Sequence, residues 1–295
     1  MRNAINSWSR REFAAILMAG ALRASAPEKK FPAEPRERLA VATYPFRHEI
    51  GSGLTLGEFA KTIPEKFAVR GIEPWSHHFQ SIEADYLHSL RKSLDGAGVH
   101  VVNIPVDIRA DLCGSEEEHA KALEAYRQWV DAAVILGSPS IRVHLPGGQK
   151  GSGSECAVNG LKAVAEYGAS KNVVINLEND DPRSEQPERI VRVIKTVKSP
   201  FLRALPDFAN SMVIHNDRNY NQQALSMLFP LAYNVSHVKN MLQDGKAIYR
   251  VDVEPIFAIA REAHYKGYFS MEWDAAGDPY GGTQLLIKST LRSLG

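Results

Sequence analysis

The sequence lacks several features that mark common classes of protein. It has no stretch of about 18 consecutive apolar residues, so no membrane-spanning helix is expected. It has no block of basic residues, and its 35 Lys and Arg nearly balance its 34 Asp and Glu. No GxGxxG motif follows the first predicted strand. These absences argue against a membrane-spanning protein, a nucleic-acid-binding protein and a dinucleotide-dependent dehydrogenase.

Cysteine is also scarce, with only Cys113 and Cys156 in the chain. Neither lies in a CxxC motif or another metal-type spacing, which argues against a structural zinc site. Both follow predicted strands and would lie on the same rim of a barrel, where an oxidising compartment would permit a disulfide. We expect two free or half-buried thiols, with a disulfide as the alternative.

The first 26 residues predict export. The motif SRREF at residues 9–13 precedes an apolar run at 14–22, and ASA at 24–26 has the small-x-small form of a signal-peptidase site. This segment resembles a twin-arginine signal peptide. The expected partner is therefore the twin-arginine (Tat) export machinery, and the expected location is the periplasm or another extracytoplasmic site. The alternative is an N-terminal amphipathic helix that packs on the folded domain.

The rest of the chain alternates short apolar segments with helical patterns. After a linker at 27–37, we expect one domain at 38–295. The predicted strands, rich in Val and Ile as buried parallel strands are, are 39–46, 71–75, 100–106, 140–145, 173–179, 202–208, 235–240 and 268–273. The predicted helices are 56–69, 82–97, 116–136, 155–170, 187–197, 222–231, 254–265 and 283–294. Eight such pairs favour an α/β fold, a single-domain (β/α)8 TIM barrel, which needs roughly 250 residues.

Four of the later predicted strands each end in a potential metal ligand. VVINLEND contains Glu178, LPDFAN contains Asp207, VSHVKN contains His237 and YFSMEWD contains Glu272. The carboxyl ends of barrel strands meet at one rim, so we expect these side chains to converge. Three carboxylates and one imidazole favour Mn²⁺, Mg²⁺ or Co²⁺, with Zn²⁺ possible. The ion could chelate a vicinal hydroxyl and carbonyl while two carboxylates move a proton.

As a set, these motifs resemble the xylose-isomerase-like TIM-barrel superfamily, the sugar phosphate isomerase/epimerase group that includes D-tagatose 3-epimerase, inosose dehydratases and, more distantly, endonuclease IV. The resemblance covers about residues 38–293. It implies that Glu178, Asp207, His237 and Glu272 bind one Mn²⁺-type ion, with the two glutamates as the acid/base pair. One position departs from the epimerases, which have a substrate-binding histidine three residues after the strand-six aspartate. This chain has Asn210 there.

Further side chains are predicted near the same rim. His144 could hydrogen-bond a substrate oxygen or act as an acid, or it could be structural. Lys239 could stabilise a developing enediolate oxygen or be a solvated rim lysine. A buried carboxylate at Glu73 needs a partner, so we expect it to support the site or form an ion pair. Trp75 could stack on a sugar.

Weaker candidates for the substrate site lie on the loops. The segment 211–222 exceeds a normal connection after a strand and could act as a lid. These weaker candidates are Arg47, His77, His78, Phe79, Asn210 and His215. The acids could instead pair with Arg142 or Lys239 in a metal-free barrel.

The expected substrate is an unphosphorylated keto-sugar, because neither 211–222 nor 242–252 has phosphate-cradling glycines. Isomerase or epimerase action through a metal-stabilised enediolate is favoured, since both glutamates are present. The alternative is a lyase or dehydratase that eliminates a β-substituent from a 3-keto-glycoside or an inosose. A non-catalytic sugar-binding protein is a third possibility, and a DNA-repair nuclease fits poorly. The chain could also form a homo-oligomer.

Overall fold

A computed structural model describes residues 30–108, 110–146, 155–182 and 185–295 of the chain. The predicted signal peptide at 1–26, and residues 27–29 of the predicted linker, lie outside the described residues. The described chain enters the domain through the short 3-10 helix η1 (Pro35–Arg38). The guanidinium of Arg38 donates hydrogen bonds to the carbonyls of Tyr265 and Gly267, which ties this entry segment to the C-terminal part of the domain.

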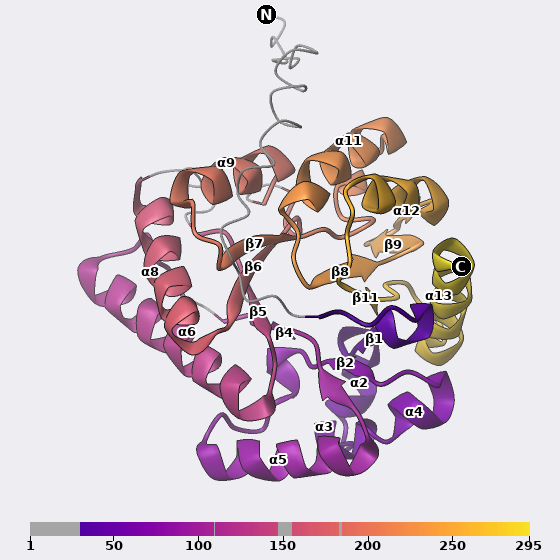
Figure 1. The fold of residues 1–295 in the computed structure, drawn as a ribbon, viewed down its shortest axis with the longest axis horizontal. Helices are drawn as coiled ribbons and strands as arrows, with labels where there is room; N and C mark the ends of the chain where they lie inside the picture. The colour runs from indigo at the N-terminus through magenta and orange to yellow at the C-terminus, as the bar shows by residue number, and fades with distance from the viewer. Residues whose placement is uncertain (1–29, 109, 147–154, 183–184) are drawn as a thin grey trace, which may run out of the picture.

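Parallel strands form a ring that helices surround (Figure 1). The two parallel sheets have the orders β3-β2-β1-β11-β8 and β4-β5-β6-β7. The segment at 100–105 contributes one short strand to each sheet, and bridges from Ala204 to Ala232 and from Asp207 to His237 join the sheets on the other side. The strands of the ring are β1 (Leu39–Ala42), β2 (Gly71–Glu73), β3 (His100–Val101), β4 (Ile104–Pro105), β5 (Ser140–Val143), β6 (Val174–Glu178), β7 (Leu202–Leu205), β8 (Val235–Val238) and β11 (Tyr268–Met271). The predicted single-domain (β/α)8 barrel is confirmed, and every strand of the ring lies inside a predicted strand range.

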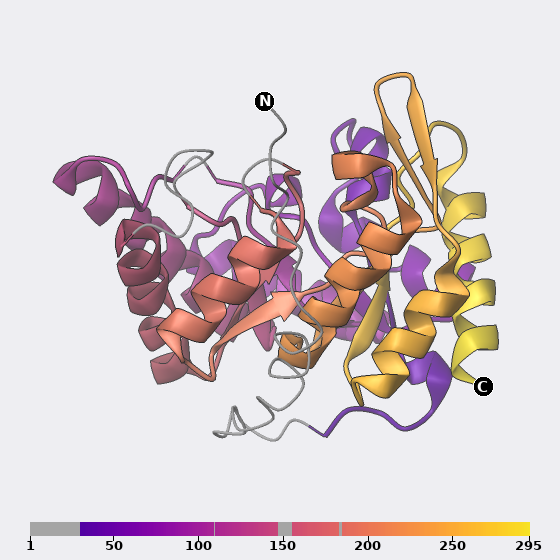
Figure 2. The same ribbon diagram turned by 90° about the horizontal axis from the view of Figure 1, so that it is seen from above.

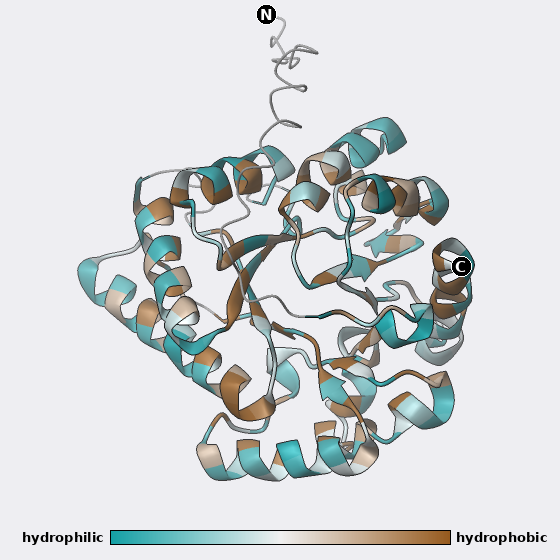
Figure 3. Ribbon diagram, viewed as in Figure 1, coloured by the Kyte–Doolittle hydropathy of each residue, from teal (hydrophilic) through white to brown (hydrophobic). Residues whose placement is uncertain are grey.

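The helices place their apolar residues toward the ring and their polar residues outward (Figure 3). They are α2 (Arg47–Ile50), α3 (Leu56–Phe59), α4 (Thr62–Phe67), α5 (Ala84–Ala97), α6 (Glu116–Leu136), α8 (Glu155–Lys171), α9 (Pro187–Val197), α10 (Met212–His215), α11 (Arg218–Leu228), α12 (Val253–Glu262) and α13 (Pro279–Leu294), with 3-10 turns η2 (Tyr44–Phe46), η3 (Ser76–His78) and η4 (Phe229–Leu231). Helix α6 begins at a capping box, in which Ser115 and Glu118 satisfy each other's backbone N–H groups. Within the described residues, no helix combines the length and apolarity needed to cross a membrane.

Two predicted helices differ from the structure because of proline. The predicted helix at 56–69 is divided into α3 and α4, since Pro64 has no N–H to donate to the carbonyl four residues earlier. The predicted helix at 222–231 begins earlier, at Arg218, and ends before Pro230. The segment 211–222, the possible lid, contains α10 and the first turn of α11.

A β-hairpin occupies the segment after β8, where no element was predicted. Strands β9 (Met241–Asp244) and β10 (Ala247–Arg250) pair in antiparallel register. Gly245 in the turn has a φ of 58°, a conformation that glycine adopts without strain. Figure 2 shows the hairpin extending beyond the ring of strands.

A layer of buried polar side chains crosses the interior of the barrel. Asn103 Oδ1 accepts hydrogen bonds from Ser140 Oγ at 2.5 Å and from Asn176 Nδ2 at 3.3 Å. Asn234 Nδ2 donates to Ser140 Oγ at 2.8 Å, and its Oδ1 accepts from Asn176 Nδ2 at 3.1 Å. These four side chains come from four segments of the ring and are fully buried. Their mutual hydrogen bonds offset the cost of burying them and hold the strands in one register.

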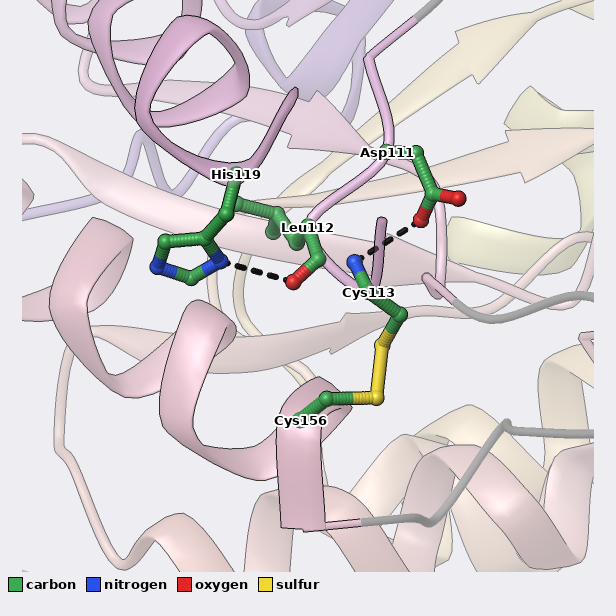
Figure 4. Close-up of a disulfide and its surroundings, with 5 residues drawn as sticks. All are labelled: Asp111, Leu112, Cys113, His119 and Cys156. Carbon is green, nitrogen blue, oxygen red and sulfur yellow. Dashed lines mark hydrogen bonds between the residues drawn. A yellow bond between two sulfur atoms is a disulfide. The ribbon is translucent and has the colours of Figure 1, made fainter. Parts of the chain in front are cut away.

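A disulfide joins Cys113 to Cys156, so the expectation of two free thiols was wrong. Their Cα atoms are 5.2 Å apart, and the bridge links the loop before α6 to the first turn of α8 (Figure 4). The loop reaches α8 because Leu112 packs against Gly160, where an added Cβ would lie only 2.9 Å from the Leu112 side chain. That contact brings the two cysteines within bonding distance.

We predict that the double variant Cys113→Ser/Cys156→Ser loses about 4 kcal/mol of unfolding free energy, the order expected for releasing a closed loop of this length. The bridge closes a loop with a sequence separation of 43 residues. Without it, this loop has more conformational entropy in the unfolded state. Urea unfolding of the wild type with and without reductant, beside the variant, measures the effect. Equal midpoints in all three samples would show that the bridge adds no stability.

Candidate functional site

The four predicted metal ligands converge at the carboxyl ends of their strands. One ligand atom from each of Glu178, Asp207, His237 and Glu272 lies within 4.8 Å of the other three. His237 Nδ1 is 2.8 Å from Glu178 Oε1, 3.0 Å from Glu272 Oε2 and 3.8 Å from Asp207 Oδ2. All four side chains are buried. The barrel thus gathers ligands from four strands into one cluster.

The carboxylates of this cluster carry oxygens suited to a cation. Glu178 Oε2, Asp207 Oδ2 and Glu272 Oε2 are buried and lie in ion pairs. Lys239 Nζ lies 3.3 Å from Asp207 Oδ2 and 3.0 Å from Glu272 Oε2, and Arg142 Nε lies 3.0 Å from Glu178 Oε2. These ion pairs match the alternative expected for a metal-free barrel. The donor set of three carboxylates and one imidazole nitrogen nevertheless fits a divalent cation.

Glu73 lies on the opposite side of the His237 ring. Its two oxygens are 3.1 and 3.0 Å from His237 Nε2, and Oε1 also accepts a hydrogen bond from Asn103 Nδ2 at 2.7 Å. A proton on Nε2 that faces Glu73 leaves Nδ1 directed at the three acids. Carboxylates hold metal-binding histidines in this way. Glu73 therefore supports the cluster from below and connects it to the polar layer of the barrel.

Neighbouring carboxylates raise the pKa of His237, and burial raises the pKa of Glu178. Burial by itself would lower the pKa of His237, but the carboxylates of Glu178, Glu272 and Glu73 raise it well above its ordinary value. Burial raises the pKa of Glu178 to about 7, although His237 and Arg142 favour its ionised form. A proton on His237 balances some of the buried negative charge.

The two glutamates differ in their tendency to ionise. Burial opposes ionisation of Glu272 as well, but His237 and Lys239 hold its pKa below its usual range. Glu178 has a raised pKa because burial outweighs its cationic neighbours. Two carboxyl groups whose pKa values are separated in this way can act as a proton donor and a proton acceptor.

Lys239 and Asn210 are buried side chains that contact the acids of the cluster. Lys239 Nζ donates to Asn210 Oδ1 at 3.0 Å, and Asn210 Nδ2 donates to Glu178 Oε1 at 3.3 Å. Burial would lower the pKa of Lys239, but Asp207 and Glu272 raise it well above its ordinary value. The ammonium group therefore stays charged beside the acids.

A cavity of about 730 Å³ opens above the cluster. Trp75 lines it, with its indole N–H donating to Asp107 Oδ2 at 2.6 Å and its ring edge-on to Tyr44 at 5.2 Å. The lining residues include Tyr44, Arg47, Glu73, Trp75, Asp107, Arg142, Glu178, Asp180, Asn210, Lys239, Gln243, Asp244, Glu272 and Asp274. The predicted site residues that reach this cavity are Arg47, Glu73, Trp75, Asn210, Lys239 and both glutamates.

His144, for which a substrate role and a structural role were both open, does not line the cavity. Its Nε2 is 2.8 Å from Asp107 Oδ1 and its Nδ1 is 3.1 Å from Glu185 Oε1. Burial would lower the pKa of His144, but hydrogen bonds to Asp107 and Glu185 raise it to about 10. Arg142 also contacts Asp107, and its Nη1 lies 2.9 Å from Nε2 of the same ring. The contacts of His144 thus stabilise the side of the cavity formed by Arg142 and Asp107.

His215 also lies away from the cavity. It is exposed at the end of α10, with its ring edge-on to Tyr220 at 4.6 Å. The aromatic loop after β2 is mostly packing: His77 stacks on Trp75 at 4.4 Å, and Phe79 packs on Trp129. His78 is buried against Thr43, and burial lowers its pKa to about 4.

Asp107, Asp274 and Gln243 are among the cavity residues that sequence analysis missed. Asp107 follows the third strand, and its carboxylate contacts Trp75 and Arg142. Asp274 lies two residues after Glu272, so strand alternation alone could have placed it on the same face. Gln243 comes from the unpredicted hairpin.

Fold and site together define an α/β-barrel protein with a carboxylate–histidine cluster at the carboxyl ends of its strands. Within that class, the chain belongs to the Xylose isomerase-like TIM barrel family, whose model matches residues 36–293. A search of curated proteins finds no match.

Solved structures with the same fold include several enzymes of low sequence identity. The 3-keto-D-glucoside 4-epimerase of E. coli is 18% identical, with a TM-score of 0.67 over 87% of this chain and 99% of that one. A D-psicose 3-epimerase, determined in the presence of D-fructose, is 16% identical, with a TM-score of 0.67 over 86% and 96% of the two chains. A probable 3-DHS dehydratase of Bacillus anthracis is 18% identical, with a TM-score of 0.65 over 87% and 98%.

We predict that Glu178→Gln and Glu272→Gln each lower the affinity for Mn²⁺ by more than about 100-fold. Each change removes a charged oxygen from the cluster, a larger loss than the 10- to 100-fold typical of supporting residues. Metal analysis after dialysis measures the effect, with Glu254→Gln on the outer helix α12 as the matched control. Unchanged metal content in both variants would indicate that Arg142 and Lys239 alone neutralise the acids.

We also predict that the apparent affinity for Mn²⁺ rises with pH. A cation can bind only when His237 and Glu178 have lost their protons, and the protein raises the pKa of both groups. Protons therefore compete at low pH and compete less as the pH rises. Calorimetric titration between about pH 6 and pH 8 should show up to about a tenfold gain per pH unit for each proton released. A constant affinity across this range would contradict the prediction.

Proposed function

We propose that the protein is a divalent-metal-dependent sugar isomerase or epimerase that acts on an unphosphorylated keto-sugar. The observation that carries this proposal is the pairing of Glu178 and Glu272 around His237 in one buried cluster, at the base of a cavity of about 730 Å³. Two carboxyl groups of different acidity at the base of a cavity are suited to moving a proton between two positions of a bound sugar.

A divalent ion would be held by Glu178, Asp207, His237 and Glu272. When bound, it would polarise a carbonyl and make the adjacent C–H more acidic. We propose Mn²⁺ as the ion, with Mg²⁺, Co²⁺ or Zn²⁺ as alternatives, because carboxylates with one imidazole suit these cations.

The chain's own residues would move the proton. Glu272, with its lowered pKa, is ionised and can accept the proton from the carbon beside the carbonyl. Glu178, the other glutamate of the cluster, would return a proton to another face or carbon. Lys239 Nζ, a charged donor at the wall, can stabilise negative charge that develops on a sugar oxygen.

The charge of the cavity supports an unphosphorylated substrate. Acidic side chains outnumber basic ones in its lining, and the three basic ones, Arg47, Arg142 and Lys239, each lie within 4.0 Å of a carboxylate. A phosphate would therefore meet net negative charge in this cavity. A neutral polyhydroxylated molecule avoids this repulsion.

A lyase or dehydratase that acts on a 3-keto-glycoside or an inosose is the alternative proposal. It shares the first proton abstraction, after which the C–H electrons form a C=C bond and a β-substituent leaves with its bonding pair. An acid must protonate that leaving group. His144 and His215, the expected acids, do not line the cavity, which favours the isomerase or epimerase.

We further propose that the protein is exported by the twin-arginine route and acts in the periplasm or another extracytoplasmic space. The motifs at residues 9–13 and 24–26 support this proposal. A disulfide between Cys113 and Cys156 is compatible with an oxidising compartment.

We predict that the Mn²⁺-loaded protein washes deuterium from D2O into a keto-sugar without breaking it. NMR of a panel of unphosphorylated ketoses and 3-keto-glycosides would detect the exchange. Glu272→Gln should slow it by about 10²- to 10⁴-fold, the usual contribution of a general base, while Glu254→Gln should not. Release of water or an aglycone would instead identify a lyase. Stoichiometric metal with no exchange on any sugar would indicate a non-catalytic sugar-binding protein.

A further inference from the structure

A second cavity, of about 500 Å³, adjoins the one above the metal cluster. Arg47, Gln243 and Asp274 line both cavities and form the boundary between them. The rest of the second cavity is lined by 45–49 after β1, by 273–279 after β11 and by Gly245 in the turn of the hairpin. A ligand at the cluster could therefore extend past this boundary without leaving the rim of the barrel.

The walls of the second cavity are held in place by specific hydrogen bonds. Gln243 N–H donates to the Asp274 carbonyl at 2.9 Å, and Ala276 N–H donates to Gln243 Oε1 at 3.0 Å, so the hairpin is tied to the segment after β11. On the other side, the Tyr280 hydroxyl donates to Glu49 Oε2 at 2.6 Å. A wall fixed before binding does not lose conformational entropy when a ligand enters.

The boundary offers both donors and acceptors. The guanidinium of Arg47 lies over the Tyr44 ring at 4.3 Å, and its Nη1 donates to the Tyr44 carbonyl. Its Nη2 is 4.0 Å from Asp274 Oδ1, a loose ion pair in which both side chains stay partly exposed. The remaining Arg47 N–H groups and the Asp274 carboxylate are thus available to the hydroxyl and bridging oxygens of a ligand.

The lining of the second cavity suits a sugar ring. Trp273 and the prolines Pro45 and Pro279 supply apolar surface, beside polar side chains that include His48 and Glu49. Sites for small molecules typically combine an apolar and aromatic wall with a few placed polar groups. The first cavity has a volume of about 730 Å³. This lies in the range of about 300–1,000 Å³ typical of sites for drug-sized ligands, which are larger than one hexose. The two cavities together therefore have space for more than one sugar ring.

We propose that the second cavity is a subsite for a second sugar ring, joined by a glycosidic bond to the keto-sugar at the metal cluster. This inference rests on the proposed function and narrows it, because the substrate class becomes a glycosylated keto-sugar rather than a free monosaccharide. The glycosidic bond would cross the boundary at Arg47, Gln243 and Asp274.

The test compares D-fructose with two disaccharides that contain it, isomaltulose and lactulose. Calorimetry of the Mn²⁺-loaded full chain should show at least tenfold tighter binding of one disaccharide than of fructose. Ala276→Trp puts a large side chain at a position that lines the second cavity, and the ratio of the two affinities should fall to about one. Ala120→Trp, at an exposed position on α6, is the matched control and should keep the ratio.

Each outcome bears on a different proposal. Equal affinities for fructose and both disaccharides in the wild type would overturn the subsite and leave the proposed function standing. A disaccharide advantage that survives Ala276→Trp would also overturn the subsite. The proposed function, and the subsite with it, would be overturned if the metal-loaded wild type binds none of these sugars and exchanges deuterium into none of them. Ala276→Leu, a smaller filling change, replaces Ala276→Trp if circular dichroism shows that the tryptophan variant is unfolded.

Discussion

Burial of three carboxylates around the imidazole of His237 is the constraint on which the rest of the site depends. Such a concentration of negative charge is costly away from water unless cations or hydrogen bonds offset it. Lys239 and Arg142 contact the acids from two sides, and Glu73 holds the far nitrogen of His237. The same cluster can hold a divalent cation, because it brings four ligand atoms within 4.8 Å of one another.

The support for this cluster runs in two directions through the barrel. Below it, Glu73 accepts from Asn103, which belongs to the buried polar layer that joins four segments of the ring. Beside it, Arg142 contacts Asp107 and the ring of His144. Catalytic geometry must be held to within a fraction of an ångström, and buried hydrogen-bonded partners provide that rigidity. The polar interior of the barrel therefore fixes where the acids point.

Local sequence patterns were enough to predict the ring and its ligands, and they failed where proline, turn chemistry or distant packing decided the outcome. Buried parallel strands are rich in Val and Ile, which makes them recognisable in the sequence. The ends of four of them carry Glu178, Asp207, His237 and Glu272. Pro64 and Pro230 interrupt patterns that helical periodicity alone would continue. Gly245, at the first position of the two-residue turn before β10, is a hairpin signal. Position alone leaves the role of His144 open, because it does not reveal that Asp107 and Glu185 engage its ring.

By itself, the sequence determined the alternation of strands and helices, the strand ends that carry ligands and the segment that resembles an export signal, because these depend on residues close together in the chain. Only the tertiary structure decided which charges share one buried volume, so that Glu178 and Glu272 differ in acidity although both are glutamates. It also decided the bridge from Cys113 to Cys156 and the second cavity beside the first. These features depend on distances between segments far apart in sequence, and packing around the closed ring sets those distances.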